Sequence, residues 1–129
     1  MQRLLLDTNA FLWWVDDALE LSTTARRVIA TADNECFLSM ASCWEMAVKS
    51  SLGKLKLKKP VMHFVQDQIA SNDFRLLNID LRHVSKVEAM PFHHRDPFDR
   101  LLIAQAVSEK LSIVSSDTIF SEYGVKIVW

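Results

Sequence analysis

Residues 3–9 read Arg-Leu-Leu-Leu-Asp-Thr-Asn, a short apolar run that ends in three turn-forming side chains. A continuous apolar run of this length predicts a strand that is buried on both faces, as strands are in parallel sheets. Asp7, Thr8 and Asn9 are expected to end that strand, because side chains of these types form hydrogen-bonded turns with the nearby backbone. The chain is therefore predicted to begin with an inner strand of a parallel sheet.

The rest of the chain alternates between strand-like and helical patterns. Strand character recurs at residues 35–39, 74–77, 111–115 and 126–129. Apolar residues at helical spacing predict helices from Ser22 onward and over residues 41–52, 60–70, 81–87 and 98–110, with a basic linker at 55–59 and a loop at 91–95. This alternation indicates an α/β fold, a three-layer α/β/α sandwich around a five-stranded, mainly parallel sheet.

Length and composition narrow the class of protein. The chain has 129 residues, half of them hydrophobic, which suits a single domain over residues 1–129. A net charge of -1 provides no overall field that would attract nucleic acid or a membrane. No apolar stretch approaches the roughly 20 residues of a membrane span, and the start lacks the apolar region of a signal peptide. Cys36 and Cys43 lie in apolar runs and are expected to be reduced thiols, so we expect a cytoplasmic protein without membrane attachment.

Four acids fall near the predicted carboxyl ends of strands, where open parallel sheets place their functional crevice. They are Asp7, Glu45, Asp99 and Asp117. Each also has a structural explanation, because Asp7 and Asp117 could form turns, and two pairs have the spacing of a capping box. These pairs are Ser42 with Glu45 and Asp96 with Asp99. For each acid taken alone, the structural explanation stays open.

Electrostatics decides what the four acids do if they converge. At about 6 Å and an effective dielectric of about 20, each like-charged pair costs roughly 3 kcal/mol, and six such pairs would rival the roughly 5–15 kcal/mol that stabilises a domain. The cluster must then take up protons or bind a cation. An all-oxygen site suits Mg²⁺ or Mn²⁺ better than zinc, and the four histidines do not form a zinc pattern. Only His94, in the loop before Asp96, is expected near the site.

Three stretches of the sequence resemble PIN-domain ribonucleases and, within them, the VapC-like toxins of toxin–antitoxin pairs. The stretches are residues 5–9, residues 39–49 with 53–55, and residues 96–106 with 115–117. The resemblance covers essentially the whole chain and implies that Asp7, Glu45, Asp99 and Asp117 are catalytic acids that bind Mg²⁺ or Mn²⁺. Asp96 competes with Asp99 as the third acid, and we favour Asp99 with Asp96 as a helix cap. Asp117 is the less typical ligand, because two serines precede it.

The function implied by the resemblance is that of a metal-dependent endoribonuclease, the toxin of a toxin–antitoxin pair. Water would cleave the phosphodiester, leaving a 5′-phosphate and a 3′-hydroxyl, with Glu45 orienting or deprotonating that water. Thr8 or Asn9, together with Ser115, would support the site, and Arg100 would contact phosphate. The implied partners are RNA, a second copy of the chain, and a small antitoxin held in an apolar groove near the site.

Basic and aromatic residues supply candidate RNA contacts. Lys49 and Lys54 belong to the densest basic stretch, and His94 and Arg95 lie close to the acids, so they are candidate substrate contacts, although a solvated surface is the alternative for each lysine. Adjacent tryptophans do not easily face one core, so one of Trp13 and Trp14 is expected to be exposed. Trp44 and Trp129 are expected to be core packing.

Three alternative functions remain. A phosphoacceptor receiver domain needs an aspartate after the third strand, where this chain has Asn78, and Asp80 is a poor substitute. A phosphatase with an aspartate nucleophile needs a second aspartate two residues after Asp7, where this chain has Asn9. An inactive PIN-like binding module is the third alternative, and the presence of all four acids argues against it.

Overall fold

The computed structural model describes residues 1–129 and contains one five-stranded sheet. The strands are β1 (Arg3–Leu6), β2 (Glu35–Ser39), β3 (Arg75–Leu77), β4 (Ser112–Val114) and β5 (Ile127–Val128). They are ordered β3-β2-β1-β4-β5, and every neighbouring pair is parallel. The predicted parallel sheet is therefore confirmed.

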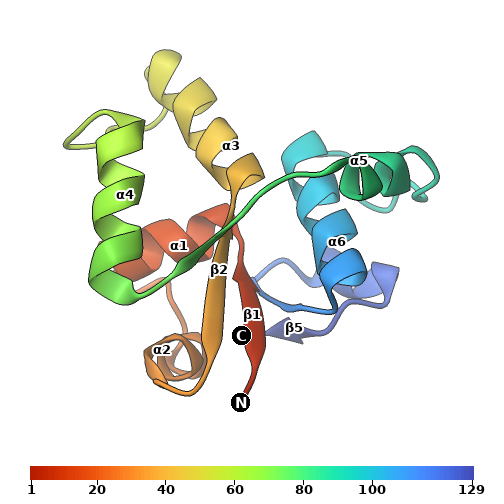
Figure 1. Ribbon diagram of the computed structural model, residues 1–129, viewed down its shortest axis with the longest axis horizontal. Helices are drawn as coiled ribbons and strands as arrows, with labels where there is room; N and C mark the ends of the chain where they lie inside the picture. Colours follow the sequence, from red (N-terminus) through yellow and green to blue (C-terminus); the bar gives the residue numbers. More distant parts are fainter.

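Helices cover both faces of this sheet. They are α1 (Thr8–Val15), α2 (Thr23–Ala30), α3 (Met40–Ser51), α4 (Val61–Asn72), α5 (Leu81–Glu88), α6 (Pro97–Glu109) and the 3₁₀ helix η1 (Thr118–Tyr123). Figure 1 shows α1, α2 and α4 on one side of β1 and β2, and α5 and α6 on the other, which gives the three layers of the predicted sandwich. None of these helices has the length and apolar character needed to cross a membrane.

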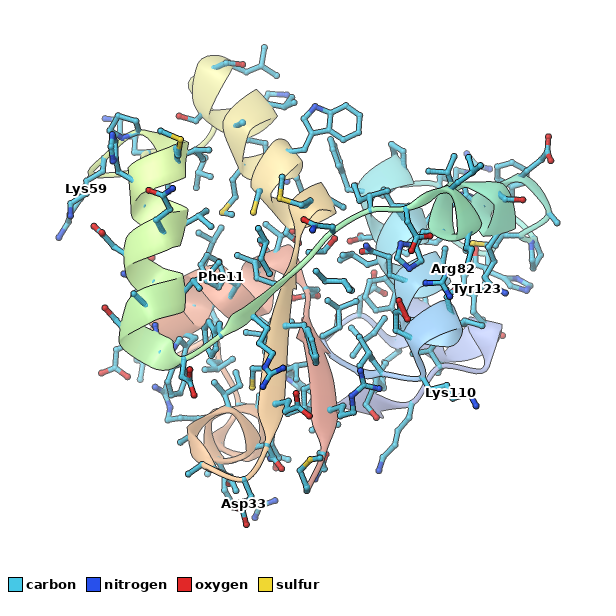
Figure 2. All side chains as sticks on the ribbon, in the orientation of Figure 1. Phe11, Asp33, Lys59, Arg82, Lys110 and Tyr123 are labelled. Atoms are coloured by element: carbon cyan, nitrogen blue, oxygen red, sulfur yellow. The ribbon has the colours of Figure 1, made fainter.

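The central strand β1 contributes side chains to the hydrophobic core on both faces of the sheet. Leu4 and Leu6 pack into a cluster that includes Phe11 of α1, whereas Leu5 packs into a second cluster with Leu102 and Phe120. All of these side chains are fully buried. Phe11, labelled in Figure 2, lies with its ring centre 6.0 Å from that of Phe64 in α4. Alternate residues of one buried strand therefore hold the two helical layers on the sheet, as the apolar run predicts.

The strand order creates a switch point between β1 and β4. From β1 the chain builds outward to β2 and β3, and it then passes through α5 and α6 and returns to the other side of β1 (Figure 1). Connections that leave two neighbouring strands in opposite directions open a crevice beyond their carboxyl ends. The backbone N–H of Asp7 donates to the carbonyl of Val114 at 3.1 Å and so joins the ends of β1 and β4 at this point.

Several local expectations were wrong. Residues 8–15 form helix α1, whereas Thr8 and Asn9 were expected only to form a turn at the end of a strand. The 3₁₀ helix η1 was not predicted. The Ser42–Glu45 capping box does not form, because α3 begins earlier, with the side chain of Ser39 accepting from the N–H of Ala41.

The tryptophans also differ from expectation. Trp44 is 59% exposed rather than part of the core. Trp13 and Trp14 are both partly buried, so neither is the exposed member expected of the pair. Trp13 packs on Trp129, so the expected packing role of Trp129 is confirmed. Trp14 donates a hydrogen bond to Asn72 at 3.0 Å. Both tryptophans pack because α1 lies between the sheet and α4.

Candidate active site

Asp7 and Asp117 lie on either side of the switch point. Asp7 is buried and caps α1, with its Oδ1 accepting from the N–H of Ala10 at 2.7 Å. Asp117 follows β4 and caps η1, with its Oδ1 accepting from the N–H of Ile119 at 3.0 Å. Both acids therefore form the local caps that the structural explanation allowed, and their position at the strand ends makes them available to the crevice as well.

Glu45 reaches the same crevice from α3. Its Oε1 lies 2.6 Å from the hydroxyl of Thr8, and its Oε2 lies 2.6 Å from the Nζ of Lys49, one helical turn further on. Glu45 is buried, and the hydroxyl of Ser42 lies 2.9 Å from that of Thr8. The carboxylate thus has a fixed position, held by one neutral donor and one cation.

Asp99 enters the crevice from the first turn of α6. Asp96 caps this helix, because its Oδ1 accepts from the N–H groups of Phe98 and Asp99 at 2.8 and 3.1 Å, and Pro97 occupies the first turn. The expected capping role of Asp96 is confirmed. Because Asp96 is held by the helix end, Asp99 is left to face the other acids, which interact with it electrostatically.

His94 joins Asp99 to Asp117. Its Nε2 lies 3.2 Å from the Oδ2 of Asp99 and 2.9 Å from the Oδ2 of Asp117. The N–H of Asp96 donates to the Nδ1 of His94 at 3.1 Å, so Nδ1 supplies a lone pair and the proton of the ring lies on Nε2. Nε2 therefore donates to the two carboxylates. The three residues are close enough to share a metal ion. In this tautomer, however, the Nε2 of His94 carries a proton and has no lone pair for a metal, so it hydrogen-bonds the two carboxylates instead.

The pKa values of two acids are raised. Burial raises the pKa of Asp7 to about 6, with smaller contributions from the charges of Glu45 and Asp117, while hydrogen bonds from Ser115 and Ala10 oppose the rise. Burial, with the neighbouring charge of Asp96 next, raises the pKa of Asp99 to about 7, and Asp7 and Glu45 add to this rise while His94 opposes it. Asp7 thus interacts with Glu45 and Asp117, and Asp99 interacts with Asp7 and Glu45, so we refer to the four acids together as the acid cluster.

The acid cluster has the donor chemistry of a site for a hard divalent cation. Its ligand atoms are carboxylate oxygens, which Mg²⁺ and Mn²⁺ prefer. A dication stabilises the ionised carboxylates that burial disfavours, so the raised pKa values of Asp7 and Asp99 fit such a role. Two basic side chains contact the acids directly. His94 contacts Asp99 and Asp117, and Lys49 contacts Glu45.

Residues 4–126 of the chain match the PIN domain. The chain belongs to the PIN-domain family. It is 30% identical over 118 residues to ribonuclease VapC22 of Mycobacterium tuberculosis, and the matched region covers 91% of this chain and 88% of that protein.

Solved structures show the same fold at lower sequence identity. VapBC2 from Rickettsia felis, bound to a DNA fragment from its promoter, has a TM-score of 0.69 and 12% identity, with 98% of this chain and 97% of that chain covered. VapBC-1 from nontypeable Haemophilus influenzae has a TM-score of 0.60 and 11% identity, with 98% and 96% covered. The fold of this PIN domain is therefore shared with the corresponding chain of two complexes.

Among the polar residues expected to support the site, Thr8 and Ser115 lie in it. Thr8 contacts Glu45, and Ser115 is buried and hydrogen-bonds Asp7 while its hydroxyl oxygen accepts from the N–H of Asp117 at 3.0 Å. Asn9 is exposed on the far side of α1, where it lines a groove. Of Thr8 and Asn9, Thr8 is therefore the residue that contacts an acid of the cluster. Ser42 was missed, because a serine inside a helix carries no distinctive sequence signal.

Arg100 is buried, whereas a residue that contacts the phosphate of a substrate must be accessible from solvent. It is 5% exposed, and its guanidinium donates to backbone carbonyls within residues 87–94 at 2.9–3.2 Å. The ring of Phe92 also packs on it, with the guanidinium carbon 4.2 Å from the ring centre. The expected phosphate role of Arg100 is therefore wrong, because its donors are already used inside the protein.

The remaining candidate cations are Lys49, Lys54 and Arg95. Lys49 lies beside the acid cluster with its side chain 46% exposed, and its pKa is raised chiefly by the hydrogen bond to Glu45. Lys54 and Arg95 are exposed. Of the three, Lys49 is the cation that the structure brings to the acids, and His94 lies between two acids instead of facing outward.

A separate groove of about 500 Å³ lies between α1, the basic linker and α4. Six of its thirteen lining residues are apolar, and the others include three lysines and two aspartates. The apolar lining residues are Leu12, Trp13, Val15, Leu55, Leu57 and Phe64. We call this the α1–α4 groove. It does not include any member of the acid cluster, although Asn9 places it within one helical turn of Asp7.

Proposed function

We propose that this PIN domain is a divalent-metal-dependent endoribonuclease and the toxin of a toxin–antitoxin pair. The observation that carries the proposal is the meeting of four buried or partly buried carboxylates at the switch point, two of them with raised pKa values. The 30% identity to a protein named as a ribonuclease supports the same activity. Hydrolysis of a phosphodiester is the reaction that such a cluster suits best, because the phosphate can be reached through a cation.

The residues proposed to hold Mg²⁺ or Mn²⁺ are Asp7, Asp99 and Asp117, with Glu45 beside them. When bound, such an ion would supply positive charge for a nonbridging phosphate oxygen and lower the pKa of an attacking water. His94 keeps Asp99 and Asp117 at a fixed separation by donating its Nε2 proton to them. Both carboxylates are thereby oriented before any ion arrives, which reduces the reorganisation that binding requires.

Glu45 is proposed to orient the attacking water. Both of its oxygens already have a donor, Thr8 on one side and Lys49 on the other, so the carboxylate cannot rotate freely. The exposed ammonium of Lys49 is proposed to contact the phosphate as well. No side chain needs to attack phosphorus and no ribose 2′-hydroxyl is needed, so the expected products carry a 5′-phosphate and a 3′-hydroxyl.

Single-turnover RNA cleavage with purified protein tests this function. Asp7→Asn is expected to lower the rate in Mn²⁺ by more than about 100-fold, because it removes a proposed ligand, and EDTA is expected to abolish cleavage by the wild type. Asp33→Asn is the matched control, because it makes the same charge change at an exposed residue far from the acid cluster (Figure 2). Equal cleavage by the wild type and Asp7→Asn, with or without EDTA, would contradict the proposal.

The partner proposals concern an antitoxin and a second copy of this chain. Two of the structural neighbours are VapBC complexes. The α1–α4 groove combines apolar side chains with Lys56 and Lys58, which pair with no acid of the structure, whereas Lys59 pairs with Asp67. Such a groove suits an amphipathic segment that carries acidic residues. We propose that the antitoxin occupies this groove. Co-expression with the product of the adjacent reading frame, followed by co-purification, tests the partnership, and sedimentation of the purified chain tests the homodimer.

A further inference from the structure

Two aromatic side chains stand at the edge of the acid cluster. Trp44 directly precedes Glu45 in α3 and is 59% exposed, and Phe98 directly precedes Asp99 in α6 and is partly buried. Their ring centres are 5.0 Å apart, with the ring planes at 75°. The helices that carry them lie against each other in the structure (Figure 1). Each acid-bearing helix therefore presents an aromatic ring next to its acid.

The contact between these rings leaves a face of the indole available. In an edge-to-face pair, one ring supports the other and does not cover it as a stacked ring would. Met40, one turn before Trp44 on the same helix, is also exposed, at 39%, and it extends the apolar surface along α3. A tryptophan with most of its surface in water lacks the burial that ordinarily stabilises it, and its position beside the acids makes its exposed ring available to a ligand at the site.

We propose that Trp44, supported by Phe98, stacks on the base of a nucleotide next to the scissile phosphodiester. This inference rests on the proposed function. A base carries no charge and is not repelled by the acids, while its phosphate lies within reach of Lys49. Every base has a flat π-face that can stack on an aromatic side chain, whereas bases inside a duplex have both faces covered by their neighbours.

The size of the aromatic patch favours a base over a second copy of the chain. Trp44 exposes on the order of 150 Å², judged from the full size of a tryptophan side chain. A stable protein–protein interface buries about 800 Å² on each partner. Acidic residues and Lys49 border the patch, and a rim of this kind suits a nucleotide, which combines an apolar ring with a charged phosphate.

Binding of a short fluorescein-labelled single-stranded RNA tests the inference without requiring cleavage. In the Asp7→Asn background, Trp44→Leu is expected to weaken binding between about 5-fold and 150-fold, the range that loss of one base–aromatic stack produces. Trp44→Phe is expected to recover most of the affinity, because it restores an aromatic face. Leu52→Ala is the matched control, since Leu52 is a similarly exposed apolar residue at the end of the same helix. The control variant is expected to bind RNA as tightly as the Asp7→Asn protein without a second substitution, which we call the parent.

Two changes of ligand distinguish stacking from a general loss of affinity. An abasic site scanned through the RNA is expected to cancel the difference between Trp44→Leu and the parent at one position, and duplex RNA is expected to bind weakly and equally to both. Equal binding of single-stranded RNA by Trp44→Leu and the parent overturns the inference. So does a loss that occurs equally for duplex RNA or at every abasic position.

The remaining outcomes separate this inference from other causes. If the parent binds no RNA at all, the proposed function fails together with the inference. If the parent binds and the wild type cleaves RNA, but Trp44→Leu behaves like the parent, the inference alone fails. If sedimentation velocity shows that Trp44→Leu converts a dimer into monomers and the RNA affinity follows the dimer concentration, the patch is a contact between copies and the inference is wrong.

Discussion

Arg100 is a buried cation whose hydrogen-bond acceptors are all backbone carbonyls. Its guanidinium donates to Val87, Met90, Pro91 and His94, and it therefore joins the first turns of α6 to the loop that carries His94. The same loop places the Nε2 of His94 against Asp99 and Asp117. Arg100 thus acts on the site from within the protein, through the position of this loop.

Replacing Arg100 is expected to destabilise the protein. Arg100→Ala leaves several carbonyls without their donor, and the free energy of unfolding is expected to fall by at least about 2 kcal/mol. Arg95→Ala, at an exposed arginine nearby, is expected to change it by less than about 0.5 kcal/mol. Urea denaturation of both variants checks this. A loss for Arg100→Ala no larger than that for Arg95→Ala would show that the carbonyls find other donors.

Single residues were the least predictable part of this molecule. Arg100 was expected to be an exposed cation and Trp44 a core aromatic residue. In the structure Arg100 is buried and Trp44 is exposed. The reason lies in the neighbouring acids, because Glu45 and Asp99 must face the crevice. Glu45 is buried and turns α3 so that Trp44, the preceding residue, lies outside. Arg100 follows Asp99 on α6 and is turned toward the end of α5 and the loop that follows it.

Helix α3 begins where strand β2 ends, and Ser39 makes this junction. Its hydroxyl oxygen accepts from the N–H of Ala41 at 2.9 Å, and its hydroxyl donates to Gln105 of α6. Ser39 is completely buried. One side chain therefore caps the helix that carries Glu45 and links it to the helix that carries Asp99.

Loss of this junction is expected to cost more than an ordinary surface change. Ser39→Ala removes a helix cap and leaves a buried amide oxygen of Gln105 without its donor, so the free energy of unfolding is expected to fall by about 1–3 kcal/mol. Ser51→Ala, at the exposed end of the same helix, is expected to change it by less than about 0.5 kcal/mol. Thermal or urea unfolding measures both. Similar values for the two variants would mean that the junction contributes nothing specific.

All five predicted strands were confirmed, whereas the helices α1 and η1 were missed. The predicted strands at 3–6 and 35–39 match β1 and β2, because continuous apolar runs between turn residues have few alternatives. Helix α1 was missed because Asp7, Thr8 and Asn9 are as typical of a turn as of a helix start. Its eight residues depend on packing against the core, through Phe11, rather than on their own helix propensity.

For the whole molecule, the raised pKa values of Asp7 and Asp99 predict a pH dependence of stability in metal-free protein. These carboxyls keep their protons in the folded state up to about pH 6 and 7, whereas in the unfolded state they lose them near the ordinary value of 3.8. The unfolded state then binds fewer protons over this interval, so stability is expected to fall as the pH rises from about 4 to 7. The total loss is of the order of a few kcal/mol.

Urea denaturation of metal-free wild type and Asp99→Asn across this interval measures the effect. The stability of the wild type relative to Asp99→Asn is expected to decrease with rising pH, because the variant lacks one of the two titrating groups. Mn²⁺ at pH 7 is expected to restore much of the lost stability in the wild type, since a bound dication stabilises ionised carboxylates. A difference that stays constant with pH would show that Asp99 titrates at its ordinary value.

The convergence of the acids followed from the predicted topology, whereas their detailed contacts did not. Parallel strands end at one edge of the sheet, so acids that follow β1, β2 and β4 had to come near one another. The bridge from His94 to Asp99 and Asp117 depends on the conformation of a loop, and the contact of Thr8 with Glu45 depends on how α3 is rotated. Sequence patterns carry no direct record of either.

The switch point between β1 and β4 sets a condition on synthesis. Asp7 is translated before its neighbours across the crevice, Ser115 and Asp117, which follow more than a hundred positions later. Strand β4 must also insert beside β1 before those side chains can meet. A nascent polypeptide that has not yet reached Asp117 therefore has no assembled acid cluster, so the site assembles only after β4 has been synthesised.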